Sequence, residues 1–278
     1  MPYVQVGTER SQPIELFYED QGEGAPIVLI HGWPSSHTMW EYQVDALVET
    51  GHRVIAYDRR GFGNSTHTAS GYDYDTLATD LNELITKLNL KRVTLAGFSM
   101  GGGEVARYCA KFGTGNIERV MLIAAIPPFM LKTSDNPEGV DQTVFDGMMQ
   151  GVKSDRPAFL DQFGKMFVNY ETTGKNRVSE DALQYSKMIG SLASATATKQ
   201  CAIAFATTDF RKDLPAINVP TLIIHGDSDQ IVPFEVSGKR SHEMMPNSQL
   251  ELIKGGSHGL MFTDTAILNE LMAKFMTG

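Results

Sequence analysis

Short apolar runs alternate with longer amphipathic segments up to residue 125 of the chain. Residues 27–30 are continuously apolar, which is typical of a strand that is covered on both faces. We expect strands at residues 4–7, 14–19, 27–30, 53–57, 93–96 and 120–123, and helices at residues 40–48, 77–88 and 105–112. Strands that alternate with helices of this length form a parallel sheet with right-handed crossover connections.

This alternation stops at Pro127-Pro128. From there to about residue 215 no run is typical of a strand, and four segments with helical spacing of apolar residues or high alanine content follow one another. These predicted helices lie within residues 140–152, 159–170, 182–192 and 193–206. The alternation then resumes through residues 221–224, 234–245, 250–253 and 266–276. The pattern predicts one α/β core, residues 1–126 and 216–278, interrupted by a helical cap insertion at residues 127–215.

The composition is that of a globular protein. Hydrophobic residues make up 42% of the 278 residues and charged residues 21%, which excludes a disordered or collagen-like chain. A chain of this length can bury a large core without disulfides or structural metals. The two cysteines, Cys109 and Cys201, fall in apolar helix-like segments, so we expect small buried side chains rather than a redox pair.

The charge and hydropathy of the chain restrict its partners. The net charge is −9 and no cluster of basic residues is present, so neither nucleic acid nor an anionic membrane is an expected partner. No apolar stretch approaches the roughly 18 residues that a membrane span needs. The N-terminus lacks the basic start and apolar run of a signal peptide. We therefore expect a cytoplasmic protein.

Residues 97–101 read Gly-Phe-Ser-Met-Gly, a G-x-S-x-G motif between a predicted strand and a helix expected to begin near Gly102. In this context Ser99 occupies a sharp strand-to-helix turn, where small neighbours avoid clashes and the hydroxyl projects clear of the sheet. Free N–H groups at the start of the helix can stabilise a developing oxyanion. A glycine-rich turn with an idle serine is the alternative, and the strand–helix context favours a nucleophile.

A serine nucleophile needs a histidine base and a carboxylate that orients the base. In this architecture the partners follow in the order serine, acid, histidine, each in a loop after a strand. His258 is the only histidine in a late loop of this kind, whereas His242 falls in a helix-period segment and is expected at the surface. Asp227 and Asp229 compete as the acid. Because Asp227 is close to the strand end, where it can cap the turn, we favour Asp229.

A second oxyanion donor is expected from the loop after the third strand, which reads His-Gly-Trp-Pro at residues 31–34. Gly32 allows close approach of the backbone, so the predicted donors are the N–H groups of Trp33 and Met100. Trp33 can also be an ordinary core aromatic, and a backbone role is compatible with either reading.

No metal or cofactor site is evident in the sequence. It contains no HExxH motif, no CxxC pair and no cluster of histidines and carboxylates. The glycine-rich segments at residues 61–63 and 101–103 match neither a P-loop nor a dinucleotide fingerprint. His31 and His225 each precede a glycine at a strand end and are expected to be structural. We therefore expect no metal and no cofactor.

With these residues identified, the chain resembles the α/β-hydrolases, and more narrowly the cofactor-free bacterial haloperoxidase (perhydrolase) and aryl esterase branch. The likeness spans nearly the whole chain and is closest at residues 57–65, 97–108, 208–211 and 225–234. It implies the α/β-hydrolase fold, a mostly parallel sheet with helices on both faces and a helical cap insertion. It also implies Ser99, Asp229 and His258 as a catalytic triad, Trp33 and Met100 as oxyanion donors, and a homo-oligomer, trimeric or hexameric.

The resemblance also implies a reaction. Small carboxylic esters would be hydrolysed through an acyl-enzyme, and hydrogen peroxide could replace water as the acyl acceptor to give a peracid that oxidises halide away from the enzyme. Related members open γ-lactams with the same triad, so a γ-lactamase or amidase is the nearest alternative. A ligand receptor with a slow triad is an alternative from another class. Dehalogenases and epoxide hydrolases of this fold need an aspartate in place of Ser99.

Aromatic residues of the insertion bear on the size of the substrate. We expect a compact apolar pocket for small acyl groups, and ordinary packing within the cap is the alternative for some of its members. The predicted lining residues are Trp33, Pro34, Phe163, Phe167, Phe205 and Ile231. In the branch that the chain resembles, a proline at the position of Pro34 accompanies good perhydrolysis, whereas a leucine accompanies mainly ester hydrolysis.

Overall fold

The structure is a computed structural model that describes residues 2–277. Within these residues, eight strands form one sheet in the order β1-β2-β4-β3-β5-β6-β7-β8. The strands are β1 (Tyr3–Glu9), β2 (Gln12–Gln21), β3 (Ala25–Ile30), β4 (His52–Tyr57), β5 (Val93–Phe98), β6 (Ile117–Ile123), β7 (Thr221–Gly226) and β8 (Ser248–Ile253). β2 pairs antiparallel with β1 and β4, and the other neighbours are parallel. The prediction of a mostly parallel sheet is confirmed.

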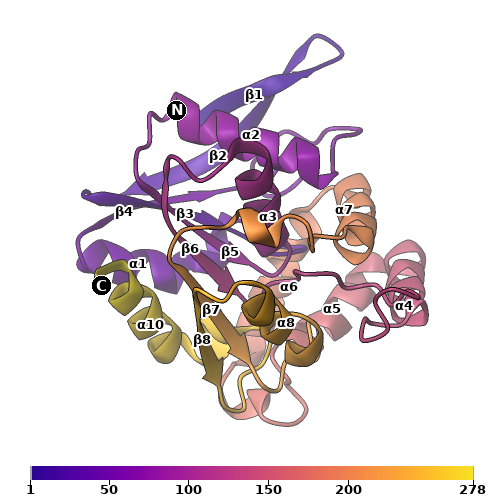
Figure 1. Cartoon of the computed structure of the whole chain (residues 1–278). Coiled ribbons are helices and arrows are strands. Elements are labelled where there is room, and N and C mark those ends of the chain that lie inside the picture. The colour runs from indigo at the N-terminus through magenta and orange to yellow at the C-terminus, as the bar shows by residue number, and fades with distance from the viewer. Residues whose placement is uncertain (1, 278) are drawn as a thin grey trace.

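Helices cover both faces of the sheet (Figure 1). One face carries α1 (Glu41–Glu49) and α10 (Thr265–Thr277), and the other carries α2 (Tyr74–Lys87), α3 (Met100–Phe112) and α8 (Gly238–Met244). Along β3, Ile27 and Leu29 pack with α1 and α10, whereas Val28 and Ile30 pack with α2 and α3. Because successive strand side chains point to opposite faces, burial on both sides requires a continuously apolar strand.

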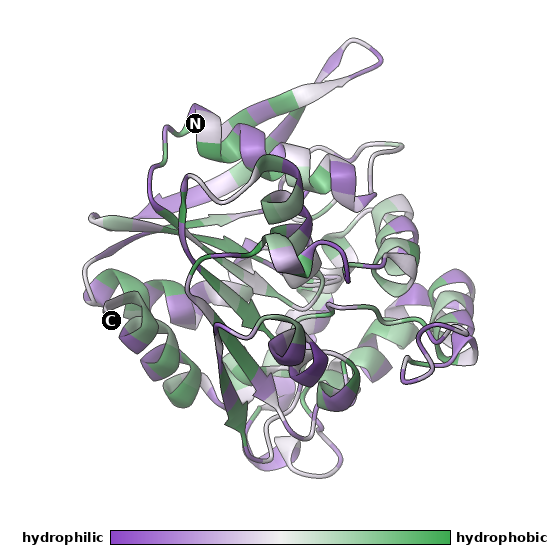
Figure 2. Ribbon diagram, viewed as in Figure 1, coloured by the Kyte–Doolittle hydropathy of each residue, from purple (hydrophilic) through white to green (hydrophobic). Residues whose placement is uncertain are grey.

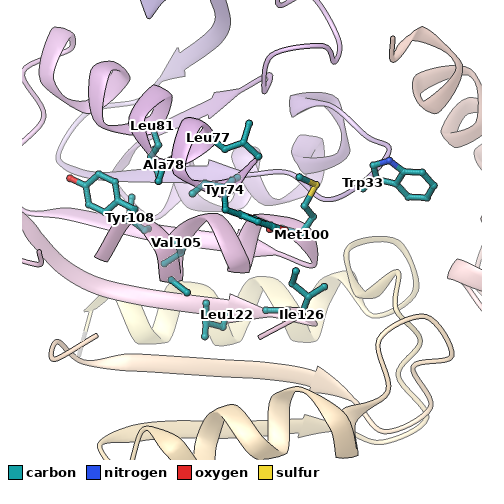
Figure 3. Packing of buried hydrophobic residues seen from close by; sticks show 14 of the residues in the cluster. Trp33, Tyr74, Leu77, Ala78, Leu81, Met100, Val105, Tyr108, Leu122 and Ile126 are labelled. Carbon is teal, nitrogen blue, oxygen red and sulfur yellow. The ribbon is translucent and has the colours of Figure 1, made fainter. Parts of the chain in front are cut away.

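The hydropathy of the elements follows this layering (Figure 2). The central strands are largely hydrophobic, whereas the outer helices combine hydrophobic and hydrophilic residues. Figure 3 shows the core between α2, α3 and the sheet, where Leu77 and Leu81 of α2 lie near Val105 of α3 and Leu122 of β6. The same cluster of buried side chains continues to Met100 and Trp33, beyond the carboxyl ends of the strands.

Four helices lie between β6 and β7 in the chain: α4 (Gln142–Ser154), α5 (Arg156–Phe167), α6 (Glu180–Leu192) and α7 (Ala195–Thr207). Each begins after an aspartate or serine whose side chain accepts a hydrogen bond from an N–H of the first turn: Asp141, Asp155, Ser179 and Ser194. The four helices predicted for this part of the chain are therefore confirmed. Among residues 2–277, no helix is both long and apolar enough to cross a bilayer.

The parallel direction of β3 to β8 brings their following loops to one edge of the sheet, since the carboxyl ends of parallel strands lie together. Two differences from the prediction lie close to these loops. α3 begins at Met100 rather than near Gly102, and a short helix, α9 (Leu260–Thr263), follows the loop that contains His258.

Candidate active site

Ser99 lies in the turn between β5 and α3 and has a φ of +53°. A residue other than glycine is uncommon in this left-handed region, and such residues concentrate at functional sites. The turn is tight because a Cβ atom at Gly97 would lie only 2.5 Å from the carbonyl oxygen of Gly101. The sharp strand-to-helix turn predicted from the G-x-S-x-G motif is therefore present.

Two further loops bring a histidine and a carboxylate to Ser99. His258, after β8, has Nε2 3.0 Å from the Oγ of Ser99. Its Nδ1 is 2.6 Å from Oδ2 of Asp229, which follows β7. When Nδ1–H donates to the carboxylate, Nε2 is left free to accept the serine proton. The arrangement can therefore generate a serine nucleophile.

Asp229 is buried and fully hydrogen-bonded. Its Oδ1 accepts the backbone N–H groups of Ile231 and Val232 at 2.9 and 2.8 Å. Burial alone would raise the pKa of Asp229, but the charge of His258 and hydrogen bonds from His225 and His258 hold this pKa well below its usual range. The carboxylate therefore stays ionised near neutral pH and can stabilise a protonated His258.

Asp227, the competing acid, has a different environment. It is exposed, and its Oδ1 accepts the backbone N–H of Gly255 at 2.7 Å and the hydroxyl of Ser228 at 2.9 Å. The hydrogen bond from Gly255 joins the loop after β7 to the loop after β8. The sequence favoured Asp229 over Asp227, and the structure places Asp229 against His258.

The imidazole of His258 is held between aromatic rings. Its centroid is 4.8 Å from the ring of Phe98 and 5.1 Å from the ring of Phe167, which meets it edge-on. Phe98 ends β5 and Phe167 ends α5. The two rings restrict rotation of the imidazole, so it keeps the orientation that joins Ser99 to Asp229.

The loop after β3 lies directly against Ser99. A Cβ atom at Gly32 would be 3.2 Å from the Cβ of Ser99 and 2.6 Å from the ring of Phe98. The indole of Trp33 is buried, and its Nε1–H donates to the carbonyl of Thr198 in α7 at 2.9 Å. Met100 is the first residue of α3, so its N–H has no acceptor within the helix. Both predicted oxyanion donors thus belong to segments that adjoin Ser99.

A buried ion pair that sequence reasoning missed connects these two segments. Nε of Arg59 donates to Oε2 of Glu104 in α3 at 2.8 Å, and both side chains are 1% exposed. A terminal nitrogen of the same guanidinium donates to the carbonyl of His31 at 2.8 Å. The hydroxyl of Tyr57 also donates to Glu104. Burial alone would lower the pKa of Arg59, but Glu104 outweighs it and raises this pKa.

His31 is a structural residue of this network, as expected. Burial, together with the charge of Arg59, lowers the pKa of His31 well below its usual value, so the ring is neutral. Its Nε2 accepts the backbone N–H of Arg59 at 3.0 Å, and Nδ1–H donates to the carbonyl of Gly32 at 2.7 Å. The network therefore holds the loop after β3 in place.

Glu104→Gln should destabilise the protein strongly, because it leaves the guanidinium of Arg59 buried without a charged partner. Removing one partner of a buried ion pair costs about 3–5 kcal/mol. Glu235→Gln is the matched control, since it removes a solvent-exposed ion pair with Lys239 and should change stability far less. Urea unfolding of both variants measures the difference. Equal losses of stability would contradict a special role for the buried pair.

A cavity of about 310 Å³ opens beside Ser99. No lining residue is charged, and apart from Ser99, Gln162 and Gln230 the lining is apolar: Trp33, Ile126, Met130, Val140, Val144, Phe145, Gly147, Met148, Gly151, Phe159, Phe163, Met166, Phe205, Ile231 and Val232. The space therefore suits an uncharged, apolar group of a substrate whose reacting atom lies at Ser99.

Four of the six predicted pocket residues line this cavity: Trp33, Phe163, Phe205 and Ile231. Pro34 and Phe167 instead line a smaller cavity of about 30 Å³ that shares Trp33 and Phe163 with the larger one. Sequence reasoning missed the contribution of α4, including Val144 and Met148. The helical spacing of apolar residues within 140–152 could have indicated this contribution, because it predicts a helix with one apolar face that must be covered.

The other candidate groups have structural surroundings. Within residues 2–277 no group of three histidine, cysteine or acidic side chains could hold a metal. Burial raises the pKa of Cys109 and Cys201 to about 12, so both remain thiols. The Nε2 of His225 lies 2.8 Å from the carbonyl of Val232 and 3.4 Å from Oδ2 of Asp229, so this histidine supports the acid of the triad. His242, expected at the surface, is half-buried and contacts the hydroxyl of Ser248 at 2.8 Å.

Comparisons with known proteins identify relatives of this chain. Residues 25–265 match the family described as alpha/beta hydrolase fold. The chain is 44% identical to the non-heme chloroperoxidase CPO-A1 of Kitasatospora aureofaciens, over 89% of this chain and 90% of that protein. It is 36% identical to the bifunctional esterase/perhydrolase DCH of Acinetobacter calcoaceticus, over 95% and 96%. The structure resembles a bromoperoxidase from Bacillus anthracis with a TM-score of 0.96, 51% identity and 99% coverage of both chains.

Proposed function

The chain belongs to the alpha/beta hydrolase family, and from this premise we propose that it is a serine hydrolase of small carboxylic esters that can also use hydrogen peroxide as acyl acceptor. The observation that carries the proposal is the hydrogen-bonded series Ser99–His258–Asp229 beside an uncharged apolar cavity. A relative named as an esterase and perhydrolase and a relative named as a chloroperoxidase support the same reaction.

In the proposed reaction, Oγ of Ser99 attacks the ester carbonyl while Nε2 of His258 takes the hydroxyl proton. The N–H groups of Trp33 and Met100 stabilise the oxyanion. His258 then protonates the leaving alcohol, and Asp229 stabilises the imidazolium throughout. An acyl group remains on Ser99. These residues supply every group that acyl transfer requires, so the proposal includes no metal and no cofactor.

The acyl-enzyme has two fates. Water, deprotonated by His258, releases a carboxylic acid. Hydrogen peroxide, deprotonated in the same way, releases a peracid, which oxidises halide in solution. A carboxylic acid can also acylate Ser99 by the reverse of hydrolysis. The expected small-molecule partners are therefore an ester or carboxylic acid and hydrogen peroxide.

We also propose that two parts of the chain have different roles. Residues 1–126 and 216–278 form the core that carries Ser99, Asp229 and His258, and residues 127–215 form a cap that supplies most of the cavity wall. The homo-oligomeric state, trimer or hexamer, and the cytoplasmic location stay predictions from the resemblance and the sequence. Light scattering on the purified protein tests the first of them.

The proposed function is tested on protein dialysed against EDTA. We expect multiple-turnover release of p-nitrophenol from the acetate ester and peroxide-dependent halogenation, both without added metal. A stoichiometric burst followed by little turnover would indicate a ligand receptor instead. Faster opening of a γ-lactam than of any ester would indicate an amidase. Loss of turnover that a divalent ion restores would contradict the metal-free mechanism.

Pro34→Leu should lower the ratio of perhydrolysis to hydrolysis several-fold while hydrolysis is kept or raised. Proline fixes its own φ near −65° and restricts the residue before it, so it limits the directions of the Trp33 carbonyl. We propose that this carbonyl accepts a hydrogen bond from hydrogen peroxide at the acyl-enzyme. Such a bond contributes about 1 kcal/mol, and about 1.4 kcal/mol changes a partition tenfold.

The measurement compares both products for the natural protein and the variant, with one ester and one peroxide concentration. An unchanged ratio would remove Pro34 from the mechanism. Plain esterase or lactamase would then describe the protein better.

A further inference from the structure

Methionine side chains form part of the cavity wall beside Ser99. Met130 follows β6, Met148 belongs to α4 and Met166 to α5, and all three line the same cavity as Ser99. Met130 is buried, Met148 is half-buried and Met166 is 48% exposed. The apolar space that receives an acyl group is therefore also lined by thioethers.

A thioether is the side-chain group that an electrophilic oxygen converts to a sulfoxide. In the proposed function, a peracid forms at Ser99 and leaves through the cavity. Reacting groups that are held together in one cavity meet at a high effective concentration. The methionines of the wall thus encounter the peracid before it is diluted into solvent.

We propose that Met148 and Met166, and more slowly the buried Met130, are sites of self-oxidation by the peracid that the enzyme makes, and that their oxidation limits the lifetime of activity in peroxide. This inference rests on the proposed perhydrolase function. The methionine sulfur attacks the terminal peroxy oxygen, an S–O bond forms and the O–O bond breaks. The proton of the terminal peroxy oxygen moves to the leaving carboxylate. Sulfur loses two electrons, and the peracid is reduced to the carboxylic acid.

Oxidation would change the cavity itself. A sulfoxide is polar and chiral where the thioether was apolar and flexible. The binding of apolar acyl groups should weaken, so KM for apolar esters should rise as the sulfoxides accumulate. Peroxide-dependent turnover therefore becomes self-limiting, whereas hydrolysis with water alone does not.

Two other methionines provide matched internal controls. Met188 of α6 is 54% exposed, slightly more than Met166, but it does not line the cavity. Met149 adjoins Met148 in α4 and is also half-buried, but it lies outside the cavity lining. An oxidant acting from solution would modify methionines according to their exposure, with Met188 first. An oxidant released at Ser99 would reverse this order.

The test incubates the full chain with an acetate ester and hydrogen peroxide, with free methionine in excess to consume any peracid that escapes. Peptide mass spectrometry follows the addition of one oxygen atom at each methionine. We expect Met148 and Met166 to be oxidised several-fold faster than Met149 and Met188. The difference should vanish in Ser99→Ala, and also in the natural protein given peroxide without ester.

Parallel samples without free methionine are assayed for peracid through halogenation. If peracid forms but Met188 is oxidised as fast as Met166, or the cavity methionines stay unmodified, the inference is overturned and the perhydrolase function stands. If ester is hydrolysed but no peracid forms, the perhydrolase function fails and the inference fails with it.

A variant tests the consequence for activity. The double variant Met148→Leu, Met166→Leu keeps apolar side chains of similar volume and should remain active longer than the natural protein during turnover with peroxide. Met188→Leu, as control, should lose activity at the rate of the natural protein. Equal lifetimes of the double variant and the natural protein would overturn the claim that these sulfoxides limit activity.

Discussion

Ser99→Ala should lower the turnover of p-nitrophenyl esters by several orders of magnitude while the protein stays folded. The substitution removes the atom that attacks the carbonyl, and only oxyanion stabilisation and substrate binding remain. Because alanine keeps the Cβ atom and loses a single hydroxyl, packing in the turn changes little. The measurement is kcat/KM for the acetate ester, together with urea unfolding to verify the fold.

Ser228→Ala is the matched control. Its hydroxyl lies in the loop after β7 and donates to the exposed Asp227 rather than to His258. This variant should keep nearly full activity. A folded Ser99→Ala protein that retained most of its ester turnover would refute the assignment of the nucleophile.

Asp229→Asn should lower kcat far more than Asp227→Asn. A neutral amide cannot hold the required tautomer of His258 or stabilise its protonated form, and in the serine-protease triad the same change costs about 10⁴-fold. Asp227 is exposed and holds only the neighbouring loop. An asparagine there keeps an oxygen that can accept the N–H of Gly255. Steady-state kinetics on the acetate ester separates the two variants.

The stability of the two variants in acid provides an independent measurement. The pKa of Asp229 is lower in the folded protein than in the unfolded chain. Its carboxylate therefore contributes stability above the unfolded value of about 3.9, and this contribution is lost as pH falls toward the folded pKa. Unfolding free energy should thus fall less steeply in acid for Asp229→Asn than for Asp227→Asn. The reverse ranking in both experiments would make Asp227 the acid.

Local patterns in the sequence were sufficient to predict the strands, the turn at Ser99 and the loop of His258. A continuously apolar run such as residues 27–30 predicts a strand buried on both faces, because successive side chains of a strand point to opposite faces of the sheet. The G-x-S-x-G motif predicts the turn at Ser99 because glycines on either side permit the close approach seen at Gly97. His258 follows from the rule that functional loops come after parallel strands.

The sequence favoured Asp229 as the acid, from the position of Asp227 at the strand end and from the family resemblance, but only the tertiary structure shows the contact between Asp229 and His258. Asp227 and Asp229 are two residues apart in one loop, and their spacing alone does not show which carboxylate contacts His258. The fold directs Oδ1 of Asp229 to backbone N–H groups and Oδ2 to His258, while Asp227 binds Gly255. The direction of each side chain within the turn decides which carboxylate contacts His258, and the spacing of the two residues in the sequence does not encode that direction.

The wall of the cavity was also decided by the tertiary structure. Helical spacing shows that one face of α4 must be covered, but not whether a core, a partner or an open cavity meets it. In the structure that face supplies Val144 and Met148 to the space beside Ser99.

The ion pair of Arg59 and Glu104 could not be predicted from local sequence patterns either, because the two residues are 45 positions apart in the chain. The sequence determined the elements and the nucleophile, whereas long-range packing determined their partners, because contacts between distant segments form only when the sheet brings them together.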